Sequence, residues 1–220
     1  NLAAAGLSPN INQRSIGAAL DAIRPAAGVR PTGAAAILFP SLAPLSSDEI
    51  LTALDMLSGQ VHGDALDVSL GGQRLLQSAL HSRLASFVGN DTVHATWMQI
   101  LGRRANQQVS HSLSGYDADH YGVVAGIDRR LTPDMHFGIA LGSLTSDVAS
   151  DFGRTDIESL FISIHGAKLF DDSQISGHFL STLDMYETIR AVSIGMLNSG
   201  PSSDSDGWGL NTGATFRHSL

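Results

Sequence analysis

The stretch "YGVVAGIDRRLTPDMHFGIALG", residues 121–142, separates into two unequal sets when every second residue is read. In a β-strand, alternate side chains point to opposite faces. One set contains large apolar residues on both sides of a central "RRLTPD" segment: Tyr121, Val123, Ala125, Ile127, Met135, Phe137, Ile139 and Leu141. The other set has little bulk and holds all four glycines: Gly122, Val124, Gly126, Asp128, His136, Gly138, Ala140 and Gly142. The stretch therefore predicts a β-hairpin with one apolar face and one face of mostly small residues.

Length and composition limit the classes of protein that this chain can represent. It has 220 residues, compatible with one or two domains, and a formal net charge of -8, which argues against a nucleic-acid partner. It contains no cysteine, so disulfide and thiolate-metal scaffolds are excluded. No apolar run reaches the ~18–20 residues of a transmembrane helix. The sequence begins at Asn1 without a signal peptide, and we expect its N-terminus to have been cut from a longer protein.

Residues 1–92 show the apolar spacing that is typical of helices. One helix is predicted over residues 12–23, where prolines and glycines then interrupt the pattern. A second is predicted over residues 46–59, because it starts with a capping serine and an acidic residue in its first turn: Ser46 or Ser47, with Glu49. A third, over residues 64–88, would span roughly 37 Å at ~1.5 Å per residue. Its apolar stripe is Leu76, Leu80, Leu84 and Phe87.

After residue 92 the apolar residues recur with a period of two, as in strands. Six strands are predicted, most of them near the ~9–11 residues that a tilted strand needs to cross a bilayer. They cover residues 94–103, 121–130, 135–144, 157–169, 174–186 and 207–217. The first is ambiguous, since Trp97 and Leu101 share a face with Gln99.

The connections between these strands alternate between long and short. Residues 104–120, 145–156 and 187–206 form long polar connections, whereas "LTPD" and "FDDS" are short. Because consecutive antiparallel strands place alternate connections at opposite ends, all the long ones fall on one side. Outer-membrane barrels show this asymmetry, with long loops outside and short turns in the periplasm. In this orientation aromatic residues fall near both membrane interfaces: Tyr121 and Trp208 outside, Trp97 and Phe170 inside.

Several segments, read in order, resemble a known family. They are "NQRSIGAALDAI", "LDMLSGQVHGDA", "LHSRLASF", "TWMQILG", the opening stretch and "DMYETIRAV". Together they are similar to the C-terminal translocator region of monomeric autotransporters, the type V secretion proteins. The resemblance implies an outer-membrane β-barrel of about 12 strands in a Gram-negative bacterium, with an α-helix in its lumen. It also implies an N-terminal passenger domain at the cell surface, and assembly by barrel-insertion machinery and periplasmic chaperones.

The predicted fold class is therefore mainly β, an antiparallel transmembrane barrel preceded by helices. We expect residues 1–92 to form a helical linker and a pore-spanning helix, approximately 64–88, and residues 93–220 to form part of the barrel. Six strands would leave two unpaired edges, which lipid does not tolerate, so we interpret the sequence as a fragment. Closure by several chains, as in trimeric relatives, is an alternative, although the matching motifs are those of the monomeric type.

In such a barrel the two strand faces have different surroundings. The small, polar face would line the lumen beside the helix, with Gly122, Gly126, Asp128, His136, Gly138, Gly142, His165, His178 and Asp184 as candidates. The apolar face would contact lipid, with Tyr121, Val123, Phe137, Ile139, Leu141, Ile162, Phe179 and Trp208 as candidates. Charges at strand ends either hold the helix or tune the lumen, or they are solvated boundary residues: Asp128, Asp156, Glu158 and Arg190.

The sequence carries no catalytic signature, and we expect no enzymatic activity, metal or cofactor. Its nine histidines never have the i, i+3 or i, i+4 spacing of metal ligands on a helix, and we interpret His136, His165 and His178 as polar lumen residues. "GDALDVSL" resembles a hydrolase motif, but Ala65 stands where the nucleophilic serine would be. The Asn90-Asp91 pair could mark cleavage of a passenger, although helix termination explains it equally well.

Two functions remain open on the sequence. The first is a membrane-embedded translocator domain that supports export of its passenger, with outer-membrane lipid as its surroundings. The second is a soluble antiparallel β-protein that acts as a binding module, in which the apolar strand face forms a core.

Overall fold

The structure is a computed structural model that describes residues 7–87, 93–109 and 113–218. The helices within these residues are α1 (Ile11–Ala22), α2 (Ala35–Leu42), α3 (Ser47–Leu57) and α4 (Gln60–Ala85). The long strands are β1 (His94–Gln107), β2 (Tyr116–Thr132), β3 (Met135–Ser150), β4 (Gly153–Phe170), β5 (Ser173–Arg190) and β8 (Ser202–His218). Two short strands between β5 and β8 form a hairpin, β6 (Val192–Ile194) and β7 (Leu197–Ser199).

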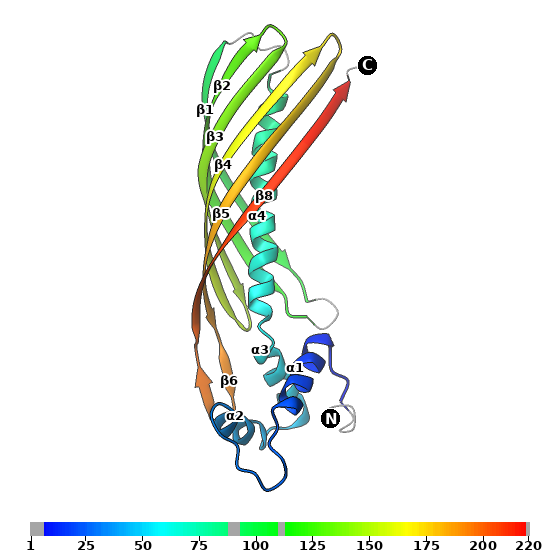
Figure 1. Cartoon of the computed structure of the whole chain (residues 1–220), viewed down its shortest axis with the longest axis vertical. Helices are drawn as coiled ribbons and strands as arrows, with labels where there is room; N and C mark the ends of the chain where they lie inside the picture. Colours follow the sequence, from blue (N-terminus) through cyan, green and yellow to red (C-terminus); the bar gives the residue numbers. More distant parts are fainter. Residues whose placement is uncertain (1–6, 88–92, 110–112, 219–220) are drawn as a thin grey trace.

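The long strands form one antiparallel sheet in the order β1-β2-β3-β4-β5-β8. Each strand pairs with the next one along the chain, apart from the inserted β6–β7 hairpin. The edge strands β1 and β8 do not pair with each other, so the sheet is not closed. Figure 1 shows the sheet curving around α4, which runs along its concave face.

The two ends of the molecule differ. Figure 1 shows α1–α3 and the β6–β7 hairpin at one end, which we call the linker end. The β1–β2 and β3–β4 connections also point toward it. The short β2–β3 and β4–β5 turns lie at the opposite end, the turn end, together with the C-terminal end of α4. Within the described parts of the chain, no helix combines the length and the apolar character needed to cross a membrane.

The six predicted strands are all present, but they are 14 to 18 residues long and exceed the predicted bounds. The long loop expected over residues 145–156 is wrong, because β3 and β4 continue through it and only Asp151 and Phe152 connect them. The inward residues Ser146, Val148 and Thr155 are buried, whereas the outward residues include the charged Asp147, Arg154 and Asp156. The outward charges gave the segment the composition of a loop.

The helices begin and end close to the predicted limits. α3 has the expected capping box, in which the backbone N–H of Ser46 donates to Glu49 Oε2 at 2.7 Å. α4 starts four residues before its predicted limit, because Gly59 takes a positive φ of 70° and starts a new helix directly after α3. α2 was not predicted, since its Pro40 disfavoured a helix in the sequence pattern.

The structure also shows which side chains of β1, the strand with the ambiguous pattern, point to the concave face. Leu101 is buried there and Trp97 packs beside it, whereas Met98 and Ile100 are exposed on the convex face. The placement of Trp97 near a lipid interface is therefore wrong. Its indole lies inside, with its ring centroid 6.2 Å from that of His165.

Candidate functional site: the concave face and its helix

α4 turns one side toward the sheet along its whole length. The buried residues on that side recur every three or four positions: Val61, Ala65, Val68, Gly72, Leu76, Ala79, Leu80 and Leu84. This spacing places them on one face of a helix. The opposite side of α4 has no cover among the described residues, and Leu66 and Leu70 are 59% and 50% exposed.

Apolar contacts join the helix to the sheet at three levels. Nearest the linker end, Ala65 and Val68 pack against Ala118, Val148 and Ile157. In the middle the helix residues Leu76, Ala79 and Leu80 pack against strand residues that include Leu101, Val124, Leu144 and Leu180. Near the turn end Leu84 and Phe87 meet Ala167. Burial of this apolar surface, at about 25 cal/mol per Å², is the main favourable contribution to docking of the helix.

Arg83, in the last turn of α4, forms an ion pair with the sheet. Its Nε donates to Asp128 Oδ2 at 2.5 Å, and Nε2 of His165 lies 2.7 Å from the other oxygen of that carboxylate. Asp128 is 3% exposed, and the side chain of His165 is fully buried. The Arg83 guanidinium also lies 5.3 Å from the centre of the Phe87 ring. A buried charge of this kind is tolerated because it is paired and hydrogen-bonded.

Glycines make the space for this cluster. A Cβ at Gly138, which lies between Asp128 and His165 in the sheet register, would clash with both of their side chains. A Cβ at Gly126 would clash in the same way with the Trp97 ring. Gly72 of α4 faces Leu144, so the helix backbone approaches the sheet closely there. The glycines of the opening stretch therefore admit large neighbouring side chains to a narrow space.

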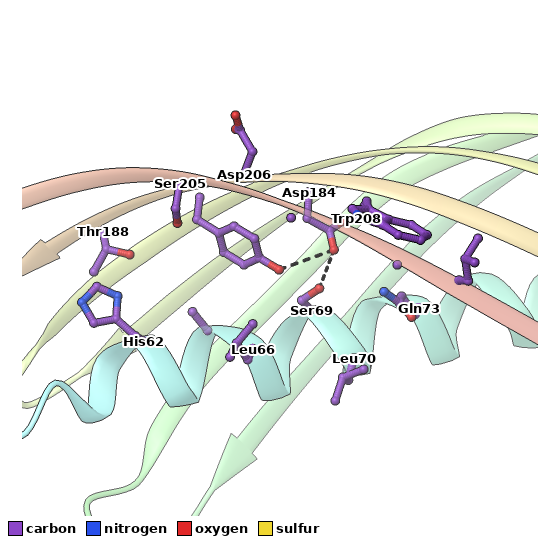
Figure 2. Close-up of a pocket in the computed structure, with 15 residues that line it drawn as sticks. His62, Leu66, Ser69, Leu70, Gln73, Asp184, Thr188, Ser205, Asp206 and Trp208 are labelled. Atoms are coloured by element: carbon purple, nitrogen blue, oxygen red, sulfur yellow. Dashed lines mark hydrogen bonds between the residues drawn. The ribbon is translucent and has the colours of Figure 1, made fainter.

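Further polar contacts hold the helix along its length. Ser69 Oγ donates to Asp184 Oδ2 at 2.7 Å, as Figure 2 shows. The Tyr186 hydroxyl approaches the same carboxylate oxygen at 3.5 Å. Gln174 Nε2 donates to the carbonyl of Leu84 in the last turn of the helix at 2.9 Å. At the linker end, the Tyr116 hydroxyl donates to Asp67 of α4.

The residues predicted to line a lumen lie on the concave face. Among the polar ones, Asp128, His136, His165, His178 and Asp184 are all buried, and two of them contact α4 through Arg83 and Ser69. His136 stacks on Phe87 with 4.7 Å between ring centroids, and His178 meets His81 of α4 edge-on at 5.1 Å. The predicted glycines share this face with them: Gly122, Gly126, Gly138 and Gly142.

Four strand-end charges were open to two readings, as holding the helix or as solvated. Asp128 holds the helix. Arg190 donates to the carbonyl of Met56, at the end of α3 rather than to α4. Asp156 is half-buried and Glu158 is exposed, both on the convex face. The possible cleavage pair Asn90-Asp91 lies outside the described residues.

The residues predicted to face lipid lie on the convex face. They are between 36% and 72% exposed: Tyr121, Val123, Phe137, Ile139, Leu141, Ile162, Phe179 and Trp208. This apolar band ends toward the linker end, where the strands continue with charged side chains. One row of directly paired positions carries Arg104, Asp119, Asp147, Asp156, Glu187 and Asp204. Beyond the band, partial burial and the neighbouring carboxylates of Asp156 and Asp119 raise the pKa of Asp147.

The open side of the sheet leaves a pocket between α4 and the edge strand β8. Its volume is about 540 Å³, and Figure 2 shows Leu66, Ser69 and Gln73 on the helix side with Asp184, Ser205 and Trp208 on the strand side. Among the described residues, no group of three histidine, aspartate or glutamate side chains is arranged to hold a metal ion. The pocket is thus the uncovered flank of the helix interface.

The sequence pattern did not indicate which helix residues make these contacts. Arg83 interrupts the apolar stripe of α4 next to Leu84, and this position beside buried residues was the available signal. Gln174 shares the parity of Ser176 and His178, which also indicated the concave face. Ser69 and Gln73 carried no signal of their own, because small polar residues are common on exposed helix faces.

Comparison with known proteins identifies this arrangement. The family model "Autotransporter beta-domain" matches residues 96–219. The chain belongs to the autotransporter beta-domain family. It is a translocator domain of the Gram-negative outer membrane.

The chain is also similar to individual proteins. Two proteins from Serratia marcescens, each named "Extracellular serine protease", are 25% and 26% identical over 155 and 159 residues. These matches cover 67% and 68% of the chain, which spans about 15% of the length of each relative. Among solved structures, the translocator domain of autotransporter NalP from Neisseria meningitidis matches with a TM-score of 0.59 at 14% identity. That match covers 71% of this chain and 53% of the NalP chain, and it shows a shared fold.

Proposed function

We propose that this autotransporter chain is one part of a translocator barrel together with the helix that occupies the lumen. In this assignment residues 1–92 are the linker and the pore-spanning helix, and residues 93–220 are barrel strands. The observation that carries the proposal is the concave face, where small residues and buried polar groups fit one helix. Burying a charged cluster such as Arg83–Asp128–His165 is costly, and a sheet that only covered an apolar core would not require it.

The two faces of the sheet then have defined surroundings. The concave residues line the lumen, and the convex apolar band contacts the hydrocarbon of the outer membrane. The charged row that begins with Arg104 and Asp119 lies beyond this band, in the extracellular medium or among lipid headgroups. The linker end is therefore extracellular, and the short turns at the opposite end are periplasmic, as in other outer-membrane barrels.

The uncovered flank of α4 supports closure of the barrel by further strands. Leu66 and Leu70 are exposed beside the unpaired edge strand β8, and lipid does not tolerate unpaired strand edges. Additional strands that pair with β8 and return to β1 would satisfy both edges and cover this side of the helix. About half of the NalP translocator domain lies outside the match with this chain, which supports the same closure.

The partners follow from this role. We assign the chain an N-terminal passenger, which the barrel exports, and the barrel-insertion machinery and periplasmic chaperones as its assembly factors. The chain itself acts without catalysis, and any enzymatic activity resides in the passenger. The activity in the names of the Serratia proteins belongs to those proteins, of which this chain matches a small part.

The alternative function, a soluble β-protein that binds a ligand, places the apolar band in a core. Family membership and the exposure of the band both favour the translocator instead.

Cysteine labelling in the full-length protein tests the closed barrel. Residues 1–220 contain no cysteine, so Leu70→Cys and Met196→Cys each introduce a single thiol into this region. Intact cells that display the passenger are treated with a membrane-impermeant maleimide. We expect Met196→Cys, at an 88% exposed hairpin tip at the linker end, to react, and Leu70→Cys to stay unreacted inside the closed barrel. Reaction of Leu70→Cys at the rate of Met196→Cys would contradict closure around the helix.

A further inference from the structure

At the linker end, two segments that are far apart in the sequence pack against each other. The helices α2 and α3 precede the lumen helix, whereas the β6–β7 hairpin extends from the β5–β8 connection (Figure 1). The hairpin is paired through Val192 with Ser199 and through Ile194 with Leu197. At its base, the N–H of Ala191 donates to the carbonyl of Phe152 at 2.8 Å, which fixes the hairpin to the β3–β4 connection.

An apolar cluster forms the contact between the helices and the hairpin. Ile194 is 1% exposed, and Val192 and Ala53 are buried with it. The surrounding side chains come from both helices, the segment between them and β7: Leu38, Leu42, Leu45, Met56, Leu57 and Leu197. These side chains form a small core of their own, separate from the clusters between α4 and the sheet.

Polar and steric contacts specify the docked position. Nη2 of Arg190, the last residue of β5, donates to the carbonyl of Met56 at 2.7 Å. A cation at the C-terminal end of α3 satisfies a free carbonyl and interacts favourably with the helix dipole. At the hairpin turn, Gly195 has a positive φ of 56°, and a side chain there would clash with the backbone carbonyl of Ser41 in α2. The hairpin tip thus fits directly against α2.

α1 is attached to the same unit through α3. Gln13 Nε2 donates to Asp55 Oδ2 at 2.7 Å and to the carbonyl of Leu51 at 3.3 Å. Asn10 Nδ2 donates to the other oxygen of Asp55 at 3.2 Å. The linker therefore forms a folded unit of several helices, held on one side by the hairpin.

We propose that the β6–β7 hairpin is a docking surface for the exported linker and that the docked unit is a latch at the extracellular mouth. This inference rests on the proposed translocator function. The lumen holds one helix, about 10–12 Å across, whereas two packed helices have axes ~8–10 Å apart and are nearly twice as wide. A linker folded against the hairpin cannot re-enter a lumen of that size. Docking after export therefore prevents the chain from sliding back and fixes the start of α4 at the mouth.

Variants of the hairpin in the full-length protein test the latch. Ile194→Ala removes the buried side chain, and Arg190→Met removes the bond to Met56 while keeping an apolar stem. Met196→Ala is the matched control, since Met196 lies on the same hairpin but points to solvent. Hydrogen exchange of the α3 amides reports the docking, and pulse-chase measurement of protease-accessible passenger on intact cells reports export. Heat-modifiable mobility shows whether each variant forms an inserted barrel.

We expect Ile194→Ala to speed exchange of α3 roughly 30-fold, because loss of a buried isoleucine side chain weakens the cluster. Arg190→Met should have a smaller effect in the same direction, and both variants should form barrels and lose export rate, whereas Met196→Ala should match the wild type. Unchanged exchange in Ile194→Ala would overturn the docking, and faster exchange with unchanged export would overturn the latch. If the wild type itself forms no barrel and displays no passenger, the proposed translocator function is contradicted, and the latch proposal, which rests on it, is contradicted as well.

Discussion

The Nε atom of Arg83 donates a 2.5 Å hydrogen bond to Oδ2 of Asp128, which lies 45 positions later in the chain. The first residue belongs to the last turn of α4 and the second to the concave face of β2, near the turn end of the sheet. His165 of β4 approaches the same carboxylate at 2.7 Å, so one buried group joins the helix to two strands. This contact fixes the C-terminal end of the helix to the sheet, and the Ser69–Asp184 bond holds the helix nearer the linker end.

Removal of Arg83 should be costly because its partner Asp128 is buried. We expect Arg83→Met to reduce the stability of the folded domain by ~3 kcal/mol, because it leaves Asp128 buried with one fewer partner. The double variant Arg83→Met/Asp128→Asn should lose less than the sum of the single variants. The free energy of unfolding is measured by urea titration of the full-length protein. The folded fraction at each urea concentration is read from heat-modifiable gel mobility. Arg74→Met, at an exposed position on the same helix, is the control and should change stability little. Equal effects of the two arginine variants would argue against the buried pair.

Gly138 provides a second, steric test of the cluster. Gly138→Ala places a methyl group against the side chains of Asp128 and His165, and overpacking of this kind typically costs about 1–3 kcal/mol. At Gly102 of β1 an added Cβ would meet only the His120 carbonyl at 3.9 Å, an ordinary contact. Gly102→Ala is therefore the matched strand control, with little expected change in the unfolding midpoint. A Gly138→Ala protein as stable as Gly102→Ala would show that the pocket can relax.

The docking of the start of α4 should depend on pH through Asp64. This residue lies beyond the apolar band at the linker end, where burial, opposed by a hydrogen bond with Gln60, raises the pKa of its carboxyl to about 6. A raised folded-state pKa means that the folded protein binds the proton more tightly than the unfolded chain does. Stability therefore increases as the pH falls from above 6 toward the ordinary value of 3.8.

Hydrogen exchange of the first two turns of α4 checks this dependence. Exchange protection, corrected for the intrinsic rate, should be greater at pH 5 than at pH 7.5, because these two conditions bracket the raised pKa of Asp64. Asp64→Asn should show high protection at both pH values because it cannot ionise. The idea fails if the wild type and Asp64→Asn have the same pH dependence.

The charged row on the convex face carries a further prediction. Asp147 lies directly between Asp119 and Asp156 in the sheet register, and like charges in such positions repel. Asp147→Asn should therefore stabilise the domain by about 0.2–1 kcal/mol, with the larger effect at low salt. Ser143→Asn, on the same face of β3, is a control without an acidic partner on either side. A lower unfolding midpoint for Asp147→Asn would contradict the repulsion.

The local parts of this fold could be predicted from the sequence. The alternation in residues 121–142 indicated the hairpin and its two faces, and the capping residues Ser46 and Glu49 marked the start of α3. The faces follow from parity alone, which is a property of neighbouring residues.

The contacts that define the site could not be predicted in the same way. The Arg83–Asp128 bond depends on how the helix is positioned against the sheet, which no local pattern records. The extent of β3 and β4 was hidden because a strand that continues beyond an apolar band has outward charges like a loop. The packing of Trp97 against Gly126 depends on the register between β1 and β2.

Nitroxide labels at two consecutive positions of β3 test the two-faced barrel most directly. Ile139 is exposed on the convex face, and Ala140 is buried on the concave face. In the full-length protein in lipid bilayers, we predict that a label at Ile139 is readily accessible to oxygen and shielded from a polar relaxation agent. A label at Ala140 should be immobilised beside the helix. Shielding of the Ile139 label from both reagents, or its free access to the polar agent, would contradict the assignment of the convex face to lipid.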